Sequence, residues 1–573
     1  MTARQTRRSR GGRVLAALFA LSLVAAACSG DDDAEEGEDA VDTTTATTAG
    51  EPEAEFAVTS YAAPDCTYGG QLQSIEAVDA TTVTFTLCTP DVAFPSKVAF
   101  SAFGIHPSEH LEATGGGGDL IEQPVGTGPY MLEAWERGSQ IVLTRNPEYW
   151  GEEPAHETVV FRWSTEAAQR LVELQSGSVD AIDNVGTDDF EVVANDSNLE
   201  LIEREATNVF YIGLNRDKPP LDDERIRQAL AMAIDRQRIV DNFYPAGSEA
   251  AEQFLPPAIP GHDEDAAWYE YDPEGARALL AEAGMADGFD ITLSYRDVVR
   301  GYLPQPAVVA QDIQAQLAEI GVRATIDVQE SGTFIDNSDA GNLTMYLLGW
   351  GADYPDATNF LDYHFGAGAS KQFGAGFPDI HEVLAEAASL TDQGERDALY
   401  ADAAELLEQH VPMIPVAHGG SAVAYKAGVE GAHASPLSNE SFAAVELAGQ
   451  DQFVWMQNGE PPGLYCADES DGEALRACEQ INESLLAYEV GGTEVIPSLA
   501  EEYESNEELT EWTFHLRDGV TFHDGTPFDA NDVVLSYAAQ WDAEHPLHVG
   551  RDGSFTYFSG LFGSFLNPPP AEE

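Results

Sequence analysis

The carboxylate of Asp353 follows an apolar run in the segment LLGWGADYPDATNF, residues 347–360. The run is typical of a buried strand that ends near Gly351, after which the chain turns through Asp353. A carboxylate that is shielded from water and faces an ammonium group forms a charge-assisted hydrogen bond. Asp353 has the side-chain type that such a bond requires. The alternative is that it caps the turn after the strand.

Two other groups of residues have spacings that could bind a metal. Asp524, Asp529 and Asp532 superficially resemble a calcium loop, but they lack the further oxygen ligands and the bidentate Glu of an EF-hand. We interpret Asp529 as a helix N-cap, with Asp532 as its partner three residues later. His106 and His110 are four residues apart in HPSEH, with a proline between them that places them where a loop enters a helix. Metal binding there is the less favoured interpretation.

Motifs of common enzyme classes are missing from the sequence, and its charge excludes one class of partner. There is no G-x-S-x-G elbow, P-loop or zinc-peptidase helix, so we expect no enzyme activity and no cofactor. The 573 residues include 27 Lys and Arg against 100 Asp and Glu, a formal charge of −73. Such a surface repels phosphate backbones, so nucleic acid is excluded as a partner. The acidity fits either a saline habitat or a lineage-wide composition.

The elements that must position these residues alternate between strands and helices. The pattern on both sides of DATT predicts a β-hairpin over 71–90. Residues 165–183 predict an amphipathic helix that Gly177 ends, followed by a short buried strand. We also expect one long helix over 219–244 and a helix that runs into a strand over 396–419. This alternation predicts an α/β protein, and the length requires two or more lobes.

The beginning of the chain has the composition of an export signal followed by a tether. A cationic stretch precedes the apolar run VLAALFALSLVAAA, which is short for a membrane span and ends at Cys28. Residues 1–28 resemble a bacterial lipoprotein signal, in which this Cys is lipidated. Residues 29–55 are acidic and rich in Thr, as in a solvated tether. We therefore expect an extracytoplasmic protein anchored to the membrane by lipid.

Four further cysteines, an even number, suggest two disulfides outside the cytoplasm. Three pairings are possible, and the sequence separations favour Cys66 with Cys88 and Cys466 with Cys478. A zinc site is the competing interpretation, but no Cys-x-x-Cys spacing or nearby His pair supports it.

Eight short segments between residues 70 and 565 together resemble one family. In chain order they are PVGTGPY, RNPEYWG, LQSGSVDAID, DERIRQALAMAID, DPEGARALLAEAG, IQAQLAEIGV, GWGADYPDATNF and LRDGVTFHDGTPFDANDV. The family is that of the large extracytoplasmic solute-binding proteins of ABC importers, in the peptide/nickel class known as family 5. In these proteins the last segment precedes the others, whereas here it follows them.

This order indicates a circular permutation. The family's N-terminal portion would correspond to residues 451–565, fused after the usual C-terminus, with new ends opening before the 71–88 hairpin. The strand at 75–87 should then share a subdomain with 482–565, and the chain near 70 and 565 should be adjacent. The apolar runs FAAVEL and QFVWM fit the join. A tandem or truncated second copy is the rival explanation, but the C-terminal piece duplicates nothing.

The resemblance implies a periplasmic-binding-protein type II fold, with two lobes that close on a ligand about a hinge and the extra subdomain of the peptide-binding class. The implied divisions are 1–28 signal, 29–55 tether, 56–160 with 482–565 extra subdomain, 161–248 with 413–481 lobe I, 249–412 lobe II, and 566–573 tail.

The resemblance also implies the site residues. In the peptide-binding branch of the family, the Asp of the GWGAD segment pairs with the ligand's α-ammonium and the Trp lines the cleft. These are Asp353 and Trp350, with Gly351 between them. Tyr211 and Asn215, in NVFYIGLNRDKPP, could bond an extended peptide backbone. Burial of Tyr211 within its strand is the alternative.

The implied function is capture of an oligopeptide or dipeptide by a monomeric, lipid-anchored protein, and its delivery to an ABC permease. Nickel chelates, haem and oligosaccharides are alternative ligands within the class. A cell-surface hydrolase and a sensing or adhesion lipoprotein are the alternatives from other classes.

Overall fold

The computed structural model describes residues 56–298 and 300–568. The expected signal, Cys28 and the tether lie outside this range. Within it the chain builds three sheets of five, six and seven strands, each with its own buried core. The described helices include none that is both long enough and apolar enough to cross a bilayer.

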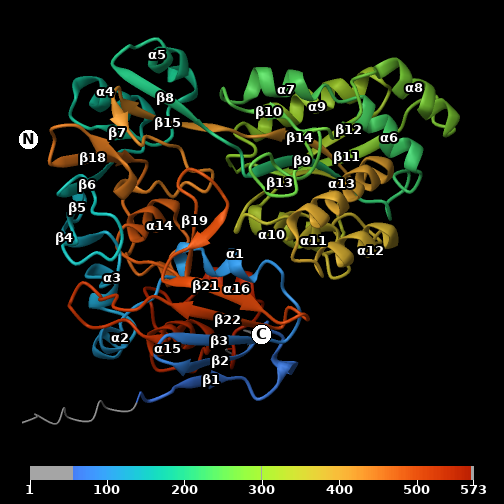
Figure 1. Cartoon of the computed structure of the whole chain (residues 1–573). Helices are drawn as coiled ribbons and strands as arrows, with labels where there is room; N and C mark the ends of the chain where they lie inside the picture. The colour runs from blue at the N-terminus through green and yellow to red at the C-terminus, as the bar shows by residue number, and fades with distance from the viewer. Residues whose placement is uncertain (1–55, 299, 569–573) are drawn as a thin grey trace, which may run out of the picture. The chain divides into compact units, whose positions relative to one another are not determined.

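The five-stranded sheet joins the two ends of the described chain (Figure 1). Its strands, in spatial order, are β1 (Ser60–Ala62), β2 (Leu72–Asp79), β3 (Thr82–Leu87), β22 (Glu511–Leu516) and β21 (Ala500–Ser505). Its helices are α1 (Phe94–Val98), α2 (Ser108–Thr114), α3 (Asp119–Glu122), α15 (Ala530–Trp541) and α16 (Thr556–Phe562). Helix α15 packs on β1, β2 and β3. The hairpin predicted over 71–90 is confirmed by the pairing of β2 with β3.

Strand β22 pairs with β3 although more than 400 residues of chain separate them (Figure 1). Trp512 lies opposite Phe85 and Phe514 opposite Val83, and all four side chains are buried in one core. The backbone N–H of Gln71 donates to the carbonyl of Phe562 at 2.7 Å. The expectation that 75–87 shares a subdomain with 482–565, with the chain near 70 adjacent to the chain near 565, is therefore confirmed.

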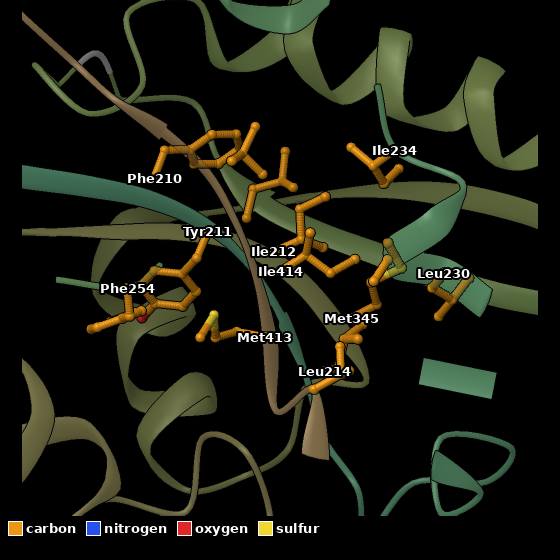
Figure 2. Close-up of a cluster of buried hydrophobic side chains, with 14 of the residues drawn as sticks. Phe210, Tyr211, Ile212, Leu214, Leu230, Ile234, Phe254, Met345, Met413 and Ile414 are labelled. Carbon is orange, nitrogen blue, oxygen red and sulfur yellow. The ribbon is translucent and has the colours of Figure 1, made fainter. Parts of the chain in front are cut away.

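The six-stranded sheet carries the strand that leads to Asp353. Its spatial order is β10 (Glu249–Ala250), β14 (Met413–His418), β9 (Asn208–Leu214), β13 (Met345–Gly351), β11 (Asp290–Arg296) and β12 (Arg323–Gln329). Its helices are α6 (Glu224–Met232), α7 (Arg236–Phe243), α8 (Pro273–Glu282), α9 (Pro306–Glu319), α10 (Ser331–Asp339), α11 (Ala357–Phe365), α12 (Pro378–Ala387) and α13 (Gln393–His410). Figure 2 shows Tyr211 and Phe254 packed on one side of β9 and Ile212 on the other, as strand alternation requires.

The prediction of a single helix over 219–244 is wrong. The chain forms two helices there, because Asp235 lies between them and caps α7 by accepting a hydrogen bond from the backbone N–H of Arg238 at 3.0 Å. The helix and strand expected over 396–419 are confirmed as α13 and β14.

The seven-stranded sheet has the order β4 (Tyr130–Glu136), β5 (Gln140–Arg145), β6 (Thr158–Trp163), β18 (Gln452–Gln457), β7 (Ala181–Ile182), β15 (Ser421–Lys426) and β8 (Leu199–Arg204). Its helices are α4 (Ala167–Ser176), α5 (Phe190–Ala194) and α14 (Gly472–Glu479). Helix α4 ends at Gly177 as predicted, because that residue adopts a left-handed conformation with φ of 80°.

Short elements complete the described secondary structure. The two-stranded ladders are β16 (Val429–Glu430) with β17 (Glu446–Leu447), and β19 (Leu486–Tyr488) with β20 (Val495–Pro497). The 3₁₀ helices are η1 (Cys66–Tyr68), η2 (Ser101–Phe103), η3 (Thr187–Asp189), η4 (Phe442–Ala444) and η5 (Cys466–Asp468).

Sheet membership departs from the expected divisions in two places. Strands β4 and β5, expected in the extra subdomain, pair with β6 in the seven-stranded sheet of lobe I. Strands β9 and β14, expected in lobe I, lie in the six-stranded sheet together with β11, β12 and β13, which were expected in lobe II. Strands β4, β5 and β6 are neighbours in the sequence and join the rest of their sheet through the pairing of β6 with β18, whereas β9 pairs with β13 and β14, which are both distant in sequence.

Both favoured disulfides are present in the structure. Cys66 and Cys88 are bonded across 22 residues of chain, and Cys466 and Cys478 across 12. The first links η1 to the residue after β3, and the second links η5 to α14.

A ring of two acids and two arginines lies buried beside the seven-stranded sheet. Arg204 donates to Asp183 at 2.9 Å and to Glu440 at 2.5 Å, while Arg476 donates to the same two carboxylates at 3.0 Å and 2.6 Å. The four side chains are at most 5% exposed. Each charge therefore has two opposite charges as neighbours, which is the arrangement that buried ions need.

Candidate functional site

A cavity of about 280 Å³ opens where β13 ends and the chain turns into α11. It is lined by Tyr211, Arg296, Arg300, Tyr302, Ile335, Asp339, Leu348, Gly349, Trp350, Gly351, Asp353, Tyr363, His364 and Gln372. Four of the five candidate ligand residues are therefore brought together: Trp350, Gly351, Asp353 and Tyr211.

Asn359 bonds the two principal candidate binding residues, Trp350 and Asp353. Its side-chain oxygen accepts from the indole Nε1 of Trp350 at 3.1 Å and from the backbone N–H of Asp353 at 3.0 Å. Its amide nitrogen donates to the carboxylate of Asp353 at 3.3 Å. The Trp350 ring also stacks on Tyr363, with 4.3 Å between ring centroids and 27° between planes.

The residues after Asp353 tie the turn to its surroundings. Tyr354 is buried in the core of the five-stranded sheet, and the ammonium of Lys97 lies 5.2 Å from its ring centroid. Asp356 caps α11 and accepts two hydrogen bonds from the guanidinium of Arg396, at 2.8 and 2.9 Å. The chain that follows Asp353 is thus held at Tyr354 by the apolar core and at Asp356 by its ion pair with Arg396.

Burial sets the electrostatics of the cavity. Desolvation raises the pKa of Asp353, and the hydrogen bond from Asn359 only partly offsets this. Desolvation also raises the pKa of Asp339, and it lowers the pKa of His364 to about 4, so that this imidazole is neutral at neutral pH. A cationic group beside Asp353 would restore the favourable environment that the carboxylate lost on leaving water.

The remaining candidates differ in how they meet the cavity. Tyr211 is fully buried in β9, and its hydroxyl donates to Gln372 at 2.9 Å, so it forms part of the cavity wall. Gly351 is exposed, and a Cβ there would meet no atom within 4 Å. Gly349 has a clearer role, because a Cβ on it would lie 2.3 Å from the Tyr302 ring.

Asn215 does not line this cavity. It is 1% exposed, and its amide nitrogen donates to the carbonyl of Gly341 at 3.0 Å. Its oxygen accepts from the backbone N–H of Asp217, also at 3.0 Å. The side chain of Asn215 therefore bonds Gly341 and the turn after β9 in this structure, and its bond to a peptide stays a prediction.

The candidate metal positions have structural roles. Asp529 and Asp532 form the predicted capping box at the start of α15, and Asp532 also accepts from Ser108. His106 is 1% exposed, and burial lowers its pKa to about 3. Over residues 56–298 and 300–568, no group of three or more His, Cys, Asp or Glu is placed to hold a metal ion.

The sequence interpretation missed several residues that line or support the cavity: Arg296, Arg300, Asp339, Asn359, Tyr363 and His364. Asn359, Tyr363 and His364 follow Asp353 on α11 and could have been found from helical spacing. Arg296 ends β11 and Arg300 follows it, and only the packing of β11 against β13 brings them to the same place.

Comparison with known proteins places the chain among solute-binding proteins. Residues 38–372 and 494–553 match the family of bacterial extracellular solute-binding proteins, family 5, middle region. The chain is 32% identical over 383 residues to di/tripeptide-binding protein 1 of Pseudomonas aeruginosa, covering 65% of this chain and 71% of the relative. It is 31% identical over 385 residues to heme-binding protein A of Haemophilus influenzae, covering 66% and 70%.

Solved structures agree with this placement. HbpA2 from Haemophilus parasuis matches with a TM-score of 0.63 and 33% identity, over 66% of this chain and 76% of that one. The murein tripeptide-binding protein MppA matches with a TM-score of 0.52 over 63% and 88% of the two chains. At 18% identity, the second match supports the fold alone.

Proposed function

Because the chain belongs to the bacterial extracellular solute-binding proteins of family 5, we propose that it captures a short peptide and delivers it to an ABC permease. Its fold is the type II periplasmic-binding-protein fold of that family. In this proposal the lobes close about a hinge on the ligand and the protein performs no chemistry on it. The peptide is a dipeptide or oligopeptide with a free amino terminus.

The half-buried carboxylate of Asp353, which lines a small cavity and whose pKa desolvation raises, is the observation that carries this proposal. A peptide's α-ammonium is the cation that this carboxylate would pair with. Arg296 and Arg300 line the same cavity, so positive charge opposite in sign to the peptide's carboxylate lies near the site. Trp350, stacked on Tyr363, supplies an apolar wall. Several relatives named for di- and tripeptide or dipeptide binding support the same ligand class.

We further propose that the chain is circularly permuted, so that residues 451–565 correspond to the family's N-terminal portion. Three observations support this. Strand β22 lies between β3 and β21, the chain near Gln71 bonds the chain near Phe562, and the family matches in two separate blocks. Permutation costs little when the old ends are close and the new ends fall in an exposed loop.

The expected lipid anchor at Cys28 completes the proposal. A lipidated Cys followed by the acidic tether 29–55 would hold the binding domain at the outer face of the membrane, where a permease can receive its ligand. A single acyl chain binds membranes only weakly, so the anchor requires more than one chain.

Calorimetry with representatives of each ligand class tests the proposal. We expect dipeptides and tripeptides to bind, and hemin, nickel–histidine and a linear oligosaccharide to bind far more weakly. Tight binding of one of the latter with no response to peptides would overturn the peptide assignment. Deleting the gene should abolish uptake of the bound peptide, and unchanged uptake would instead indicate a sensing protein. Turnover of the peptide by the purified protein would indicate a hydrolase.

A further inference from the structure

We propose that Asn359 is a positioning residue, whose single side-chain amide sets both the carboxylate of Asp353 and the indole of Trp350 for the ligand's amino terminus. The inference rests on the proposed function, in which Asp353 receives that group.

The side-chain hydrogen bonds of Asn359 all go to the two candidate binding residues. It is 4% exposed in the first turn of α11, and each of its three side-chain hydrogen bonds goes to Trp350 or to Asp353. The oxygen serves as a double acceptor and the amide nitrogen as a donor, which Asn can do and neither Leu nor Ala can. One side chain therefore couples the charged and the apolar parts of the cavity.

The donor bond to Asp353 also controls its charge. Burial disfavours the ionised carboxylate, and the amide of Asn359 favours it. Ammonium binding requires the ionised form, so affinity should fall as the pH falls through the pKa of Asp353. The titratable or charged groups that line the cavity with Asp353 are Tyr211 of β9, Arg296 of β11, Arg300, Tyr302, Asp339 of α10, and Tyr363 and His364 of α11; Tyr557 of α16 also interacts with its charge. None of them is altered by a change at 359.

The test measures peptide affinity against pH for the unmodified protein and for Asn359→Leu. We expect the variant to bind a free-amine dipeptide about ten- to a hundredfold more weakly at neutral pH. Its acid limb should move to higher pH, because the bond that favours the carboxylate is gone. Affinity for the N-acetylated dipeptide, which has no ammonium, should change much less. A purely structural role would instead lower both affinities alike and leave the midpoint unmoved, and that result would overturn the proposal.

Two further variants distinguish a specific effect on binding from a general loss of stability. Asn359→Asp keeps the oxygen that accepts from Trp350 but places a second carboxylate beside Asp353, so it should move the midpoint further upward. Asn146→Leu is the matched control. Asn146 is also 4% exposed, and its side-chain amide donates to the carbonyl of Gly128 at 3.1 Å and accepts from the backbone N–H of Glu148 at 3.0 Å. It should lower the melting temperature without altering the free-to-acetylated affinity ratio.

Crystal structures separate this inference from the proposed function. If the unmodified protein binds no peptide, the proposed function fails, but the placement of Asp353 and Trp350 can still be compared between the unmodified protein and Asn359→Leu. We expect the Asp353 carboxylate to turn and the Trp350 ring to leave its stack on Tyr363. Unchanged positions of both side chains in the variant would overturn the positioning role whatever the ligand is.

Discussion

The contribution of an ion pair to the free energy of unfolding depends on its burial. The buried ring of Asp183, Arg204, Glu440 and Arg476 allows a test of this dependence. Glu440 is 0% exposed and receives a hydrogen bond from each arginine. Glu440→Gln keeps the shape of the side chain but removes the charge. Two arginines would then share one acid, which leaves an uncompensated positive charge away from water.

The expected cost follows from that uncompensated charge. Removing one partner of a buried pair typically destabilises a protein by about 3–5 kcal/mol. The matched control is Asp290→Asn, which breaks the 2.6 Å pair between Arg323 and Asp290, whose side chains are 57% and 81% exposed. An exposed pair contributes at most about 1 kcal/mol. The contact distances are similar, so the difference reflects the burial of Glu440 and its second arginine partner.

Urea unfolding followed by tryptophan fluorescence measures the effect. Trp455 lies 5.3 Å from the guanidinium of Arg476 and reports on this part of the fold. Equal losses in the two variants would refute the reasoning. The ring should also weaken in acid, because its arginines hold the pKa of Asp183 down at about 2. Its stabilising effect should be complete above about pH 4, the ordinary Asp value, and lost as the pH falls toward 2.

Three further predictions concern charge, covalent links and export. Burial raises the pKa of Glu479 to about 8, so the free energy of unfolding should fall as the pH rises from about 4.5 through 8. Glu479→Gln should therefore stabilise the protein at pH 8.5 but not at pH 5. An equal effect of the substitution at both pH values, measured by urea unfolding, would contradict this. Replacing Cys66 and Cys88 together by Ser should cost about 3 kcal/mol through loop closure, and an unchanged unfolding midpoint would refute that estimate. Cys28→Ala should release the protein into the soluble extracytoplasmic fraction, whereas retention in the membrane would argue against lipidation.

Features that depend on neighbouring residues could be predicted from the sequence. The hairpin of β2 and β3, the end of α4 at Gly177 and the capping box at Asp529 each rest on a few adjacent residues. The break between α6 and α7 was missed because Asp235 suits a helix surface as well as an N-cap. Its role as the N-cap of α7, and not as a surface residue of one longer helix, depends on tertiary packing.

Features that depend on pairing between distant segments could not be predicted. Asp183 and Glu440 meet only because β8 and α14 each present an arginine to the same buried space. The site shows both cases. Trp350 and Asp353 were found from one short segment, whereas Arg300 reaches the cavity only through the packing of β11 beside β13. Asn215 lies outside the cavity lining, and its position in the sequence does not show that its amide bonds Gly341.

The most direct test of the central claim is calorimetry of one dipeptide, free and N-acetylated, with the unmodified protein and with Asp353→Asn. Leaving the ammonium without its buried partner typically costs about 3–5 kcal/mol, or about two to four orders of magnitude in affinity. We predict that the free dipeptide binds the unmodified protein tightly and loses that affinity in Asp353→Asn. The acetylated dipeptide should bind both proteins weakly. Equal binding of free and acetylated dipeptide to the unmodified protein would contradict the account and make Asp353 a cap of the turn after β13.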